Sequence, residues 1–192
     1  MQEDCYPGYQ IVKLLSEDTN ILYEVEPVSD SSHTTYIMKV YRGKDALKRY
    51  SNEICYLTFL SSYDIAPRVI YHKRCNDDAA VAIIEKFSYS VKDLVEDEDV
   101  FADIKEDLIA QIDQKIGLMH QLDIGHGDLH PGNIVVNLNP LRAAIIDFEY
   151  AYKISAGEHD PRVKEWMKRG FDWTGTYSEF VEYDLQNWKY AI

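Results

Sequence analysis

The chain has 192 residues, of which 46% are hydrophobic and 28% are charged, and its formal net charge is −13. This composition is typical of a globular protein with a buried core, and the length fits one domain or two small lobes. The acidic balance argues against nucleic acid or an anionic membrane surface as a partner, because both are bound through clustered basic side chains.

Nothing in the sequence indicates a membrane span or a secreted protein. No apolar run approaches the roughly 18–20 residues that a membrane span needs, and the acidic segment Met1–Cys5 lacks the apolar core of a secretory signal. The three cysteines, Cys5, Cys55 and Cys75, lack the close spacing of a zinc site. We therefore expect reduced thiols and a cytoplasmic protein, or one in a host cytosol if it is an exported effector.

Residues 1–86 have the pattern of an α+β lobe. Three short strands, Tyr9–Leu15, Asn20–Pro27 and Thr34–Tyr41, are separated by polar turns. Side chains then recur at intervals of three and four residues, as on one face of a helix, and two further strands follow. The residues that mark the helix are Ala46, Tyr50, Glu53, Leu57 and Leu60, and the two strands are Arg68–His72 and Ala79–Ile84.

Residues 87–192 have the pattern of a mainly helical lobe. The acidic stretch Glu96–Asp107 lies at the start of a long helix, where negative charge is favourable. Two apolar runs, Ile134–Val136 and Ala143–Ile146, predict a β-hairpin. The long helix is marked by Phe101, Ile104, Leu108, Ile112, Lys115 and Met119, and two tail helices are predicted to begin at Asp160-Pro161 and at Thr176 with Glu179.

The segment 126–133 carries the strongest chemical signal. It has the sequence His-Gly-Asp-Leu-His-Pro-Gly-Asn, it leads into the predicted hairpin, and the second strand of that hairpin ends at Asp147. The hairpin therefore brings Asp128, Asn133 and Asp147 to one end. Asn133 and Asp147 offer the hard oxygen ligands that Mg²⁺ takes together with phosphates, and Asp128 is placed to accept a proton from a hydroxyl.

A second pair of residues stands out in the first lobe. Lys39 lies within an apolar strand, and Glu53 lies in the apolar stripe of the predicted helix. Burying either charge alone is costly, and pairing the two removes much of that cost. Such a pair can hold the lysine against nucleotide phosphates.

These motifs, taken together, resemble those of the protein-kinase-like superfamily from about Tyr9 to Tyr150. The segment 126–133 with Asp147-Phe148-Glu149 resembles the catalytic loop and the metal-binding motif. The amino-acid sequence of segment 126–133 is most similar to that of the branch of aminoglycoside, choline and lipopolysaccharide kinase-like proteins and to that of small atypical protein kinases. The resemblance implies a bilobal α+β fold, with a five-stranded antiparallel N-lobe at 1–86 and a truncated, mainly helical C-lobe at 87–192.

The resemblance also assigns roles to single residues. Asp128 would be the catalytic base, Lys39 paired with Glu53 would position ATP, and Asn133 with Asp147 would bind Mg²⁺. His126 would support the loop backbone, and Asp160 is expected to cap a helix rather than to brace the catalytic loop. The predicted nucleotide contacts are Lys39, Ile37, Ile84 at the gatekeeper position, Glu85, Phe87, Val135 and Ile146.

The sequence also departs from the superfamily pattern. The glycine-rich phosphate loop is absent, because Leu15–Leu22 has no glycine and places Glu17 and Asp18 in the turn, where they would repel a triphosphate unless they point outward. Ile37 narrows the adenine pocket. Gly127 replaces the arginine that reads a phosphorylated activation loop, which predicts constitutive activity or activation by a partner.

Three functions are compatible with these features. The first is a minimal atypical serine/threonine protein kinase that uses Mg²⁺ and ATP on a protein substrate and acts as a monomer. The second is a kinase of a small hydroxylated or aminated molecule, which His130 favours because serine/threonine kinases usually place a lysine there. The third is a pseudokinase binding module, which the missing glycine loop favours.

Overall fold

The computed structural model describes residues 5–29, 33–159, 163 and 176–192. They divide into two compact units, which we call the sheet unit, residues 1–61 with 67–86, and the helical unit, residues 62–66 with 87–192. Residues 62–66 follow the predicted N-lobe helix but group with the helical unit. One hydrogen bond and two ion pairs join them to it: the Ile65 carbonyl accepts from the Ile145 amide, and Asp64 forms ion pairs with Lys115 and Arg142.

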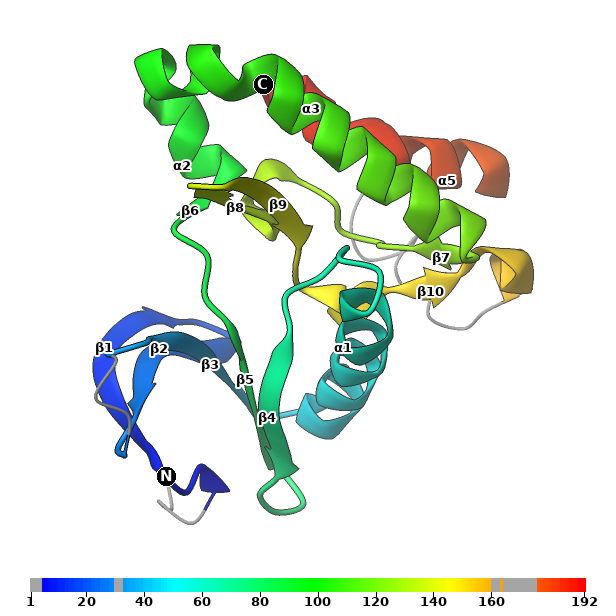
Figure 1. Cartoon of the computed structure of the whole chain (residues 1–192). Coiled ribbons are helices and arrows are strands. Elements are labelled where there is room, and N and C mark those ends of the chain that lie inside the picture. Colours follow the sequence, from blue (N-terminus) through cyan, green and yellow to red (C-terminus); the bar gives the residue numbers. More distant parts are fainter. Residues whose placement is uncertain (1–4, 30–32, 160–162, 164–175) are drawn as a thin grey trace. The chain divides into compact units, whose positions relative to one another are not determined.

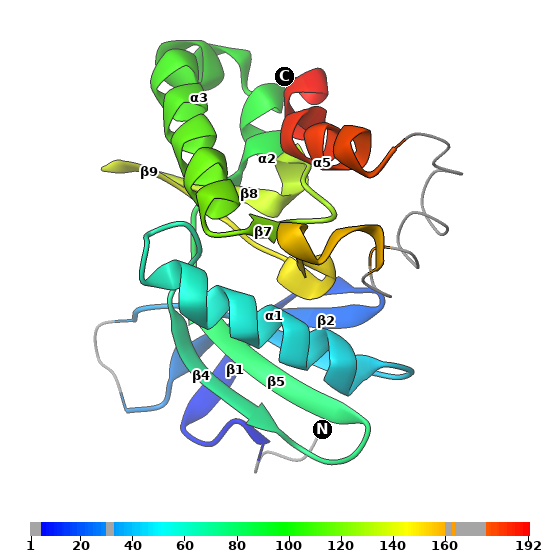
Figure 2. The ribbon, with the colours of Figure 1, turned by 90° about the vertical axis from the view of Figure 1, so that its right-hand side faces the viewer.

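The sheet unit is one antiparallel five-stranded sheet with a helix on one face (Figures 1 and 2). The strand order is β1-β2-β3-β5-β4, so β1 and β4 form the two edges. The five predicted strands and the helix are all present. Their bounds are β1 Tyr9–Glu17, β2 Asn20–Pro27, β3 Tyr36–Arg42, α1 Ala46–Ser61, β4 Val69–Arg74 and β5 Ala79–Glu85.

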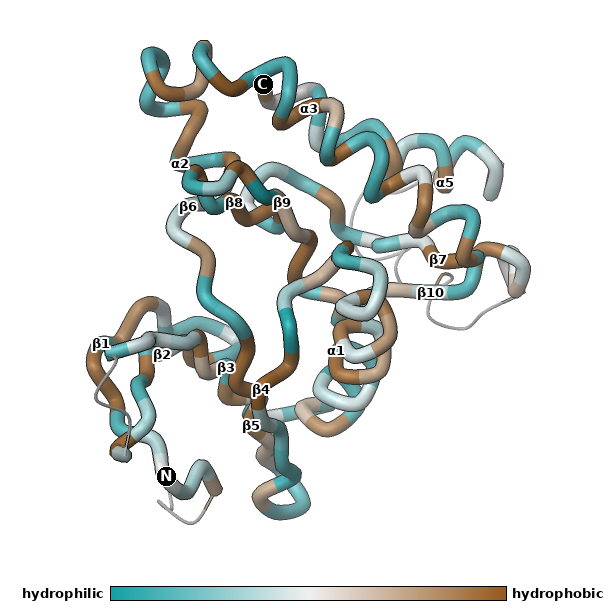
Figure 3. The backbone as a smooth tube through the Cα atoms, viewed as in Figure 1, coloured by the Kyte–Doolittle hydropathy of each residue, from teal (hydrophilic) through white to brown (hydrophobic). Residues whose placement is uncertain are grey.

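The two faces of this sheet bury different side chains because successive residues of a strand point to opposite faces. Met38 and Val40 of β3 pack with Ile83 of β5 in one core cluster. Tyr41 and Ala82 belong to the other cluster, with residues of α1. Apolar residues on both faces explain why β5 is coloured hydrophobic along much of its length in Figure 3.

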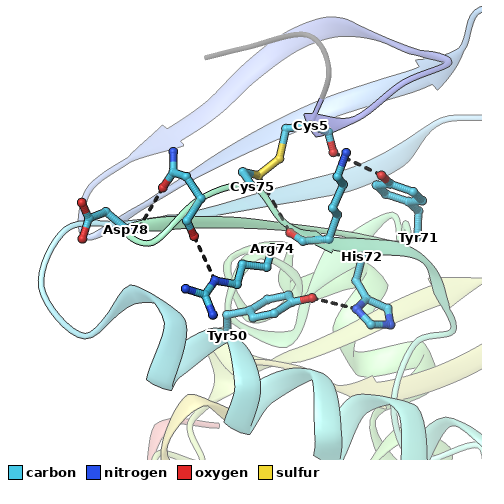
Figure 4. Close-up of a disulfide and its surroundings, with 9 residues drawn as sticks. Cys5, Tyr50, Tyr71, His72, Arg74, Cys75 and Asp78 are labelled. Atoms are coloured by element: carbon cyan, nitrogen blue, oxygen red, sulfur yellow. Dashed lines mark hydrogen bonds between the residues drawn. A yellow bond between two sulfur atoms is a disulfide. The ribbon is translucent and has the colours of Figure 1, made fainter.

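A disulfide closes the first of these two cores. Cys5 and Cys75 are bonded, with their Cα atoms 5.4 Å apart, and the Tyr71 hydroxyl donates to the Cys5 carbonyl at 3.3 Å (Figure 4). The expectation that all three cysteines are reduced thiols is therefore wrong for this pair. The two cysteines are 70 residues apart, so the sequence alone does not show that the segment before β1 lies next to the segment just after β4. Cys55 is a free, exposed thiol.

Removing this bond is expected to lower stability in non-reducing buffer. A cross-link over 70 residues restricts the unfolded chain strongly, so Cys75→Ser should lower the free energy of unfolding by about 2–4 kcal/mol. Chemical denaturation measures the loss. Cys55→Ser is the matched control and should leave stability within about 0.5 kcal/mol of wild type. Three titratable thiols in the unreduced, denatured wild-type protein would contradict the prediction.

The helical unit combines a long helix with shorter α- and 3₁₀-helical segments and short strands. β8 and β9 form the predicted hairpin, to which β6 adds as a third strand, and β7 pairs with β10. The two-residue strands β6, β7 and β10 were not predicted. The bounds are β6 Tyr89–Ser90, α2 Val91–Glu96, α3 Glu98–Gln121, β7 Ile124–Gly125, β8 Ile134–Leu138, β9 Leu141–Ile145, β10 Tyr152–Lys153 and α5 Tyr177–Gln186, with 3₁₀ turns at Pro131–Asn133, Phe148–Tyr150, Ile154–His159 and Asn187–Ala191.

The long helix begins later than the acidic stretch suggests. Glu96 ends α2, and Asp97 caps α3 by accepting from the Val100 amide at 3.4 Å. Glu98 and Asp99 then lie in the first turn of α3, where negative charge stabilises the helix. Hydrophilic and hydrophobic residues alternate along α3 in Figure 3, and the apolar ones, Phe101, Leu108, Ile112, Ile116 and Met119, are buried.

The tail helix α5 begins as predicted. The Thr176 side chain and the Glu179 backbone form a reciprocal capping box, with the Glu179 carboxylate accepting from the Thr176 amide at 2.6 Å. Phe180 and Trp188 are buried, as expected for packing residues. The predicted helix from Asp160 to Gly170 lies outside the described residues, apart from Val163.

The architecture confirms the predicted fold class. A five-stranded antiparallel sheet with one helix is followed along the chain by a mainly helical part that carries a β-hairpin. Among the described residues, no helix has both the length and the apolar character needed to cross a membrane.

Candidate active site

The hairpin of the helical unit brings together the ends of two segments that carry polar side chains. Asn133 ends the 3₁₀ turn that leads into β8, and Asp147 follows β9 by two residues. The Ile146 amide donates to the Asn133 carbonyl at 2.9 Å. Asn133 and Asp147 therefore lie at the same end of the hairpin, as the sequence predicts.

The Asn133 side chain is buried and is oriented by a hydrogen bond to the loop backbone. Its Nδ2 donates to the Asp128 carbonyl at 2.9 Å. An amide group has one donor side and one acceptor side, so this bond leaves Oδ1 as the group that can meet a ligand. A carboxamide oxygen beside a carboxylate is a donor set suited to a hard divalent cation. Asn133 and Asp147 thus fit the predicted magnesium site chemically.

Asp147 adopts an unusual backbone conformation. Its φ of 65° and ψ of 57° place it in the left-handed region, which side chains other than glycine rarely enter. Asp and Asn are the residues that tolerate this region best. The turn at Asp147 ends β9 and begins the 3₁₀ turn at Phe148–Tyr150, so the local fold fixes where this carboxylate leaves the hairpin.

His126 links the catalytic-loop segment to the hairpin, as the resemblance implies. Its Nδ1 accepts from the Asp128 amide at 3.2 Å, so its Nε2 carries the proton that is donated to the Ile146 carbonyl at 2.8 Å. The ring is fully buried and lies 4.9 Å from the Phe148 ring, centroid to centroid. With both nitrogens engaged, His126 positions backbone rather than binding a metal.

Asp184 of α5 braces the same loop and was not predicted as a site residue. Its carboxylate is buried and accepts from the amides of His126 and Gly127, each at 2.9 Å, and from the Tyr152 hydroxyl at 3.5 Å. Carboxylates bonded to backbone amides make strong hydrogen bonds. Asp184 thus braces the loop, whereas Asp160, for which the sequence suggests this role or helix capping, lies outside the described residues.

Two backbone features allow this arrangement. Gly127 has a φ of +83°, so the loop turns here through a conformation that favours glycine. Gly125 faces the Tyr152 ring so closely that a Cβ atom at this position would clash with it. The loop can therefore approach the ring whose hydroxyl meets Asp184.

The Asp128 carboxyl is half-buried near other charged groups. Burial raises the pKa of Asp128 above its ordinary value, and the nearby carboxylates of Asp147 and Asp184 act in the same direction. The rings of His130 and His126 oppose this effect on the Asp128 pKa. A carboxylate whose pKa is raised accepts a proton more readily than a carboxylate with an ordinary pKa.

The sheet unit contains the second predicted constellation. Lys39 Nζ donates to Glu53 Oε2 at 2.7 Å, and both side chains are nearly inaccessible, with 10% and 3% exposed. The Tyr41 hydroxyl donates to the same oxygen at 2.8 Å. The structure thus pairs Lys39 with Glu53 and adds Tyr41, a partner that sequence reasoning missed.

The predicted adenine-side residues of this unit share a face of the sheet with Lys39. Ile37 and Ile84 are direct cross-strand partners, and Lys39 lies two residues beyond Ile37 on the same strand. Glu85 is engaged within its own unit: its amide donates to the Arg68 carbonyl at 2.9 Å, and its carboxylate accepts from the Arg68 amide at 3.2 Å.

The remaining predicted nucleotide contacts belong to the helical unit. Phe87 packs beneath the Arg142 guanidinium, 4.9 Å from the ring centroid. Val135 of β8 is half-buried and pairs with Ala144. Ile146 is half-buried beside Asp147. Within this unit, Ile146 therefore lies close to Asn133. The Phe87 ring packs against Arg142.

A change at Glu53 tests the buried pair. Glu53→Gln keeps a side-chain acceptor but removes the charge that compensates Lys39, so the free energy of unfolding should fall by about 1.5–3 kcal/mol. Chemical denaturation of Lys39→Met, Glu53→Gln and the double variant measures the coupling, which should reach about 0.5–3 kcal/mol for residues in contact. Additive single effects would show that the two side chains do not interact in solution.

Comparisons with known proteins agree with this geometry. Residues 83–154, which include the loop 126–133, the hairpin and Asp147, match the model of the phosphotransferase enzyme family APH. Over 159 residues the chain is 31% identical to the sensor for unfolded proteins in the ER ire1 of Schizosaccharomyces pombe (strain 972 / ATCC 24843), an alignment that covers 71% of this chain. The chain spans 15% of the length of that relative.

These matches, together with the fold, confirm the resemblance to the protein-kinase-like superfamily. The fold and the matched segment are similar to those of kinase-like phosphotransferases.

Proposed function

We propose that this chain is an ATP- and Mg²⁺-dependent phosphotransferase that transfers the γ-phosphoryl group of ATP to a serine or threonine hydroxyl of a protein. The observation that carries the proposal is the hydrogen-bonded end of the β8–β9 hairpin. There Asn133 is fixed by Asp128, and Asp147 leaves the adjacent strand in a left-handed turn. The match of residues 83–154 to a phosphotransferase family supports the reaction class.

Each side chain has a role in this proposal. Asp128 orients the acceptor hydroxyl and takes its proton as the oxygen bonds to the γ-phosphorus and the bond to the leaving ADP oxygen breaks. Lys39, held by Glu53, positions the α- and β-phosphates. Asn133 and Asp147 would hold Mg²⁺, which would supply neutralisation of phosphate charge when bound.

The remaining predicted nucleotide-binding residues would contact the adenine base. Ile37, Ile84, Val135 and Ile146 would supply apolar contacts to adenine, and backbone groups of Glu85 and Phe87 would supply polar ones. Because phosphoryl transfer depends on positioning and charge neutralisation, the fixed backbone around His126 favours catalysis.

A second candidate is a kinase of a small hydroxylated or aminated molecule. It is favoured by His130, which is exposed and whose Nδ1 accepts from the Gly132 amide at 3.1 Å, so the ring caps the 3₁₀ turn. Serine/threonine kinases, which the sequence resembles, usually have a lysine at this position. The strongly acidic chain would also attract a cationic substrate.

Transfer of ³²P from [γ-³²P]ATP separates these functions. The wild-type protein is incubated with lysate proteins in one series and with small hydroxylated or aminated compounds in another, and the acceptor is identified in each. Labelling of protein hydroxyls supports the first candidate, and labelling of a small molecule supports the second. If no acceptor is labelled and no nucleotide binds, both enzymatic proposals are wrong.

A further inference from the structure

The turn between β1 and β2 lacks glycine but is held by side chains from elsewhere in the sheet unit. Glu17 and Ile21 are the last cross-strand pair, and only Asp18 and Thr19 lie between the ends of β1 and β2. The Asp18 amide donates to the Asn20 carbonyl at 3.0 Å. Strand β1 therefore extends two residues beyond its predicted end, and the turn is tighter than the sequence suggests.

Arg42, at the end of β3, contacts both acidic residues of this segment. Its Nη1 lies 3.1 Å from Glu17 Oε1, and its Nη2 donates to the Asp18 carbonyl at 3.2 Å. One guanidinium thus compensates the Glu17 charge and fixes the backbone at the turn. The Glu17 side chain is 54% exposed, so the ion pair alone contributes little to stability. The effect of Arg42 is to fix the position of the turn and to compensate the negative charge of the turn.

Arg49, in the first turns of α1, completes the arrangement. Its Nη2 donates to Asn20 Oδ1 at 3.1 Å and to the Arg42 carbonyl at 3.0 Å, and its Nη1 donates to the Lys44 carbonyl at 2.9 Å. Arg49 is half-buried, unlike Arg42. A rigid guanidinium fork can hold three acceptors from separate segments in a fixed geometry, which a lysine ammonium cannot do equally well.

We propose that Arg42 and Arg49 are positioning residues for nucleotide binding: both hold the glycine-free β1–β2 turn in place, and Arg42 compensates its acidic charge. We call this set of contacts the arginine clasp. The proposal rests on the proposed function and takes the bound triphosphate to lie beside this turn, which stands in place of the glycine-rich phosphate loop of the resembled superfamily. A glycine-rich loop meets phosphate through closely approaching backbone amides; here the turn is set by side chains before any nucleotide binds.

The clasp is tested first without nucleotide. Hydrogen exchange of backbone amides in residues 15–22 should be at least fivefold faster in Arg49→Ala than in wild type, and Arg49→Lys should not restore protection. Arg74→Ala is the matched control, because Arg74 makes a similar pair with Asp77 at the β4–β5 turn of the same sheet. It should leave exchange in 15–22 unchanged. Unchanged exchange in Arg49→Ala would overturn the clasp.

The charge effect is tested with MgATP. Arg42→Ala should raise the dissociation constant about three- to tenfold, and adding Glu17→Gln to this variant should recover at least half of the loss, because the uncompensated carboxylate is then neutral. Arg74→Ala should bind as wild type does. Binding by Arg42→Ala equal to wild type, or no recovery with Glu17→Gln, would overturn the charge role. Absence of MgATP binding to the wild type would overturn the proposed function instead, and the exchange measurement would still decide the clasp.

Discussion

Asp128→Asn is expected to reduce phosphoryl transfer by about 10²–10⁴-fold, the usual contribution of a positioned proton acceptor. The substitution keeps the size of the side chain and leaves the backbone amide of Asp128, which donates to His126 Nδ1, in place. The loss should therefore appear in kcat, with little change in nucleotide affinity. Initial rates of ³²P transfer at saturating ATP measure it.

The control for charge is Asp107→Asn, because Asp107 is an exposed residue of α3 outside the site. This variant should retain the wild-type rate within about twofold, as expected for a surface position. A transfer rate of Asp128→Asn within a few-fold of wild type would remove Asp128 from the proposed mechanism while leaving nucleotide binding untouched.

Asp184→Ala is expected to cause the largest loss of stability. The His126 and Gly127 amides lie in a buried part of the loop, and both lose their acceptor. Each unsatisfied buried donor costs about 1–3 kcal/mol, so the free energy of unfolding should fall by roughly 2–6 kcal/mol. Urea denaturation measures the loss, and hydrogen exchange of residues 126–128 should show where it arises.

Glu182→Ala on the same helix is the matched control. Glu182 is exposed, and its carboxylate accepts a long hydrogen bond, 3.5 Å, from Gln186. Removal of the Glu182 carboxylate should change the free energy of unfolding by less than about 0.5 kcal/mol. If Asp184→Ala were as stable as Glu182→Ala, the claim that Asp184 braces the loop would be wrong.

A buried charge among apolar side chains can be recognised from the sequence when its partner is also a side chain. Glu53 stands out because a carboxylate in an apolar helical stripe needs a partner, and the structure supplies Lys39. Asp184 shows the same pattern, since it lies between Val181 and Leu185 on the apolar face of α5. It was overlooked because its partners are backbone amides 57 and 58 residues away, which leave no mark in the sequence.

Contacts between distant segments account for most of the remaining differences. The Cys5–Cys75 bond depends on where the segment before β1 runs, which no local pattern reveals. The grouping of residues 62–66 with the helical unit depends on Asp64, whose two cationic partners lie on α3 and β9. The strands β7 and β10 have two residues each, too few to show the alternation by which strands are recognised.

The local elements, in contrast, were predicted well because each has its own signal. The α1 stripe, the hairpin and the Thr176–Glu179 capping box all depend on residues within a few positions of one another. The break between α2 and α3 was missed because Asp97 lies in a run of acids, where a capping side chain cannot be told from a solvated one.

The account depends most on the claim that Asn133 and Asp147 bind a magnesium nucleotide. Titration calorimetry with a non-hydrolysable ATP analogue, with and without Mg²⁺, tests this directly in the wild type and in Asp147→Asn. Asparagine tolerates the left-handed conformation at this position, so the fold should be retained. We predict binding at least tenfold tighter with Mg²⁺ in the wild type and loss of that dependence in the variant. Wild-type binding that is absent or indifferent to Mg²⁺, or equal Mg²⁺ dependence in both proteins, would contradict the account.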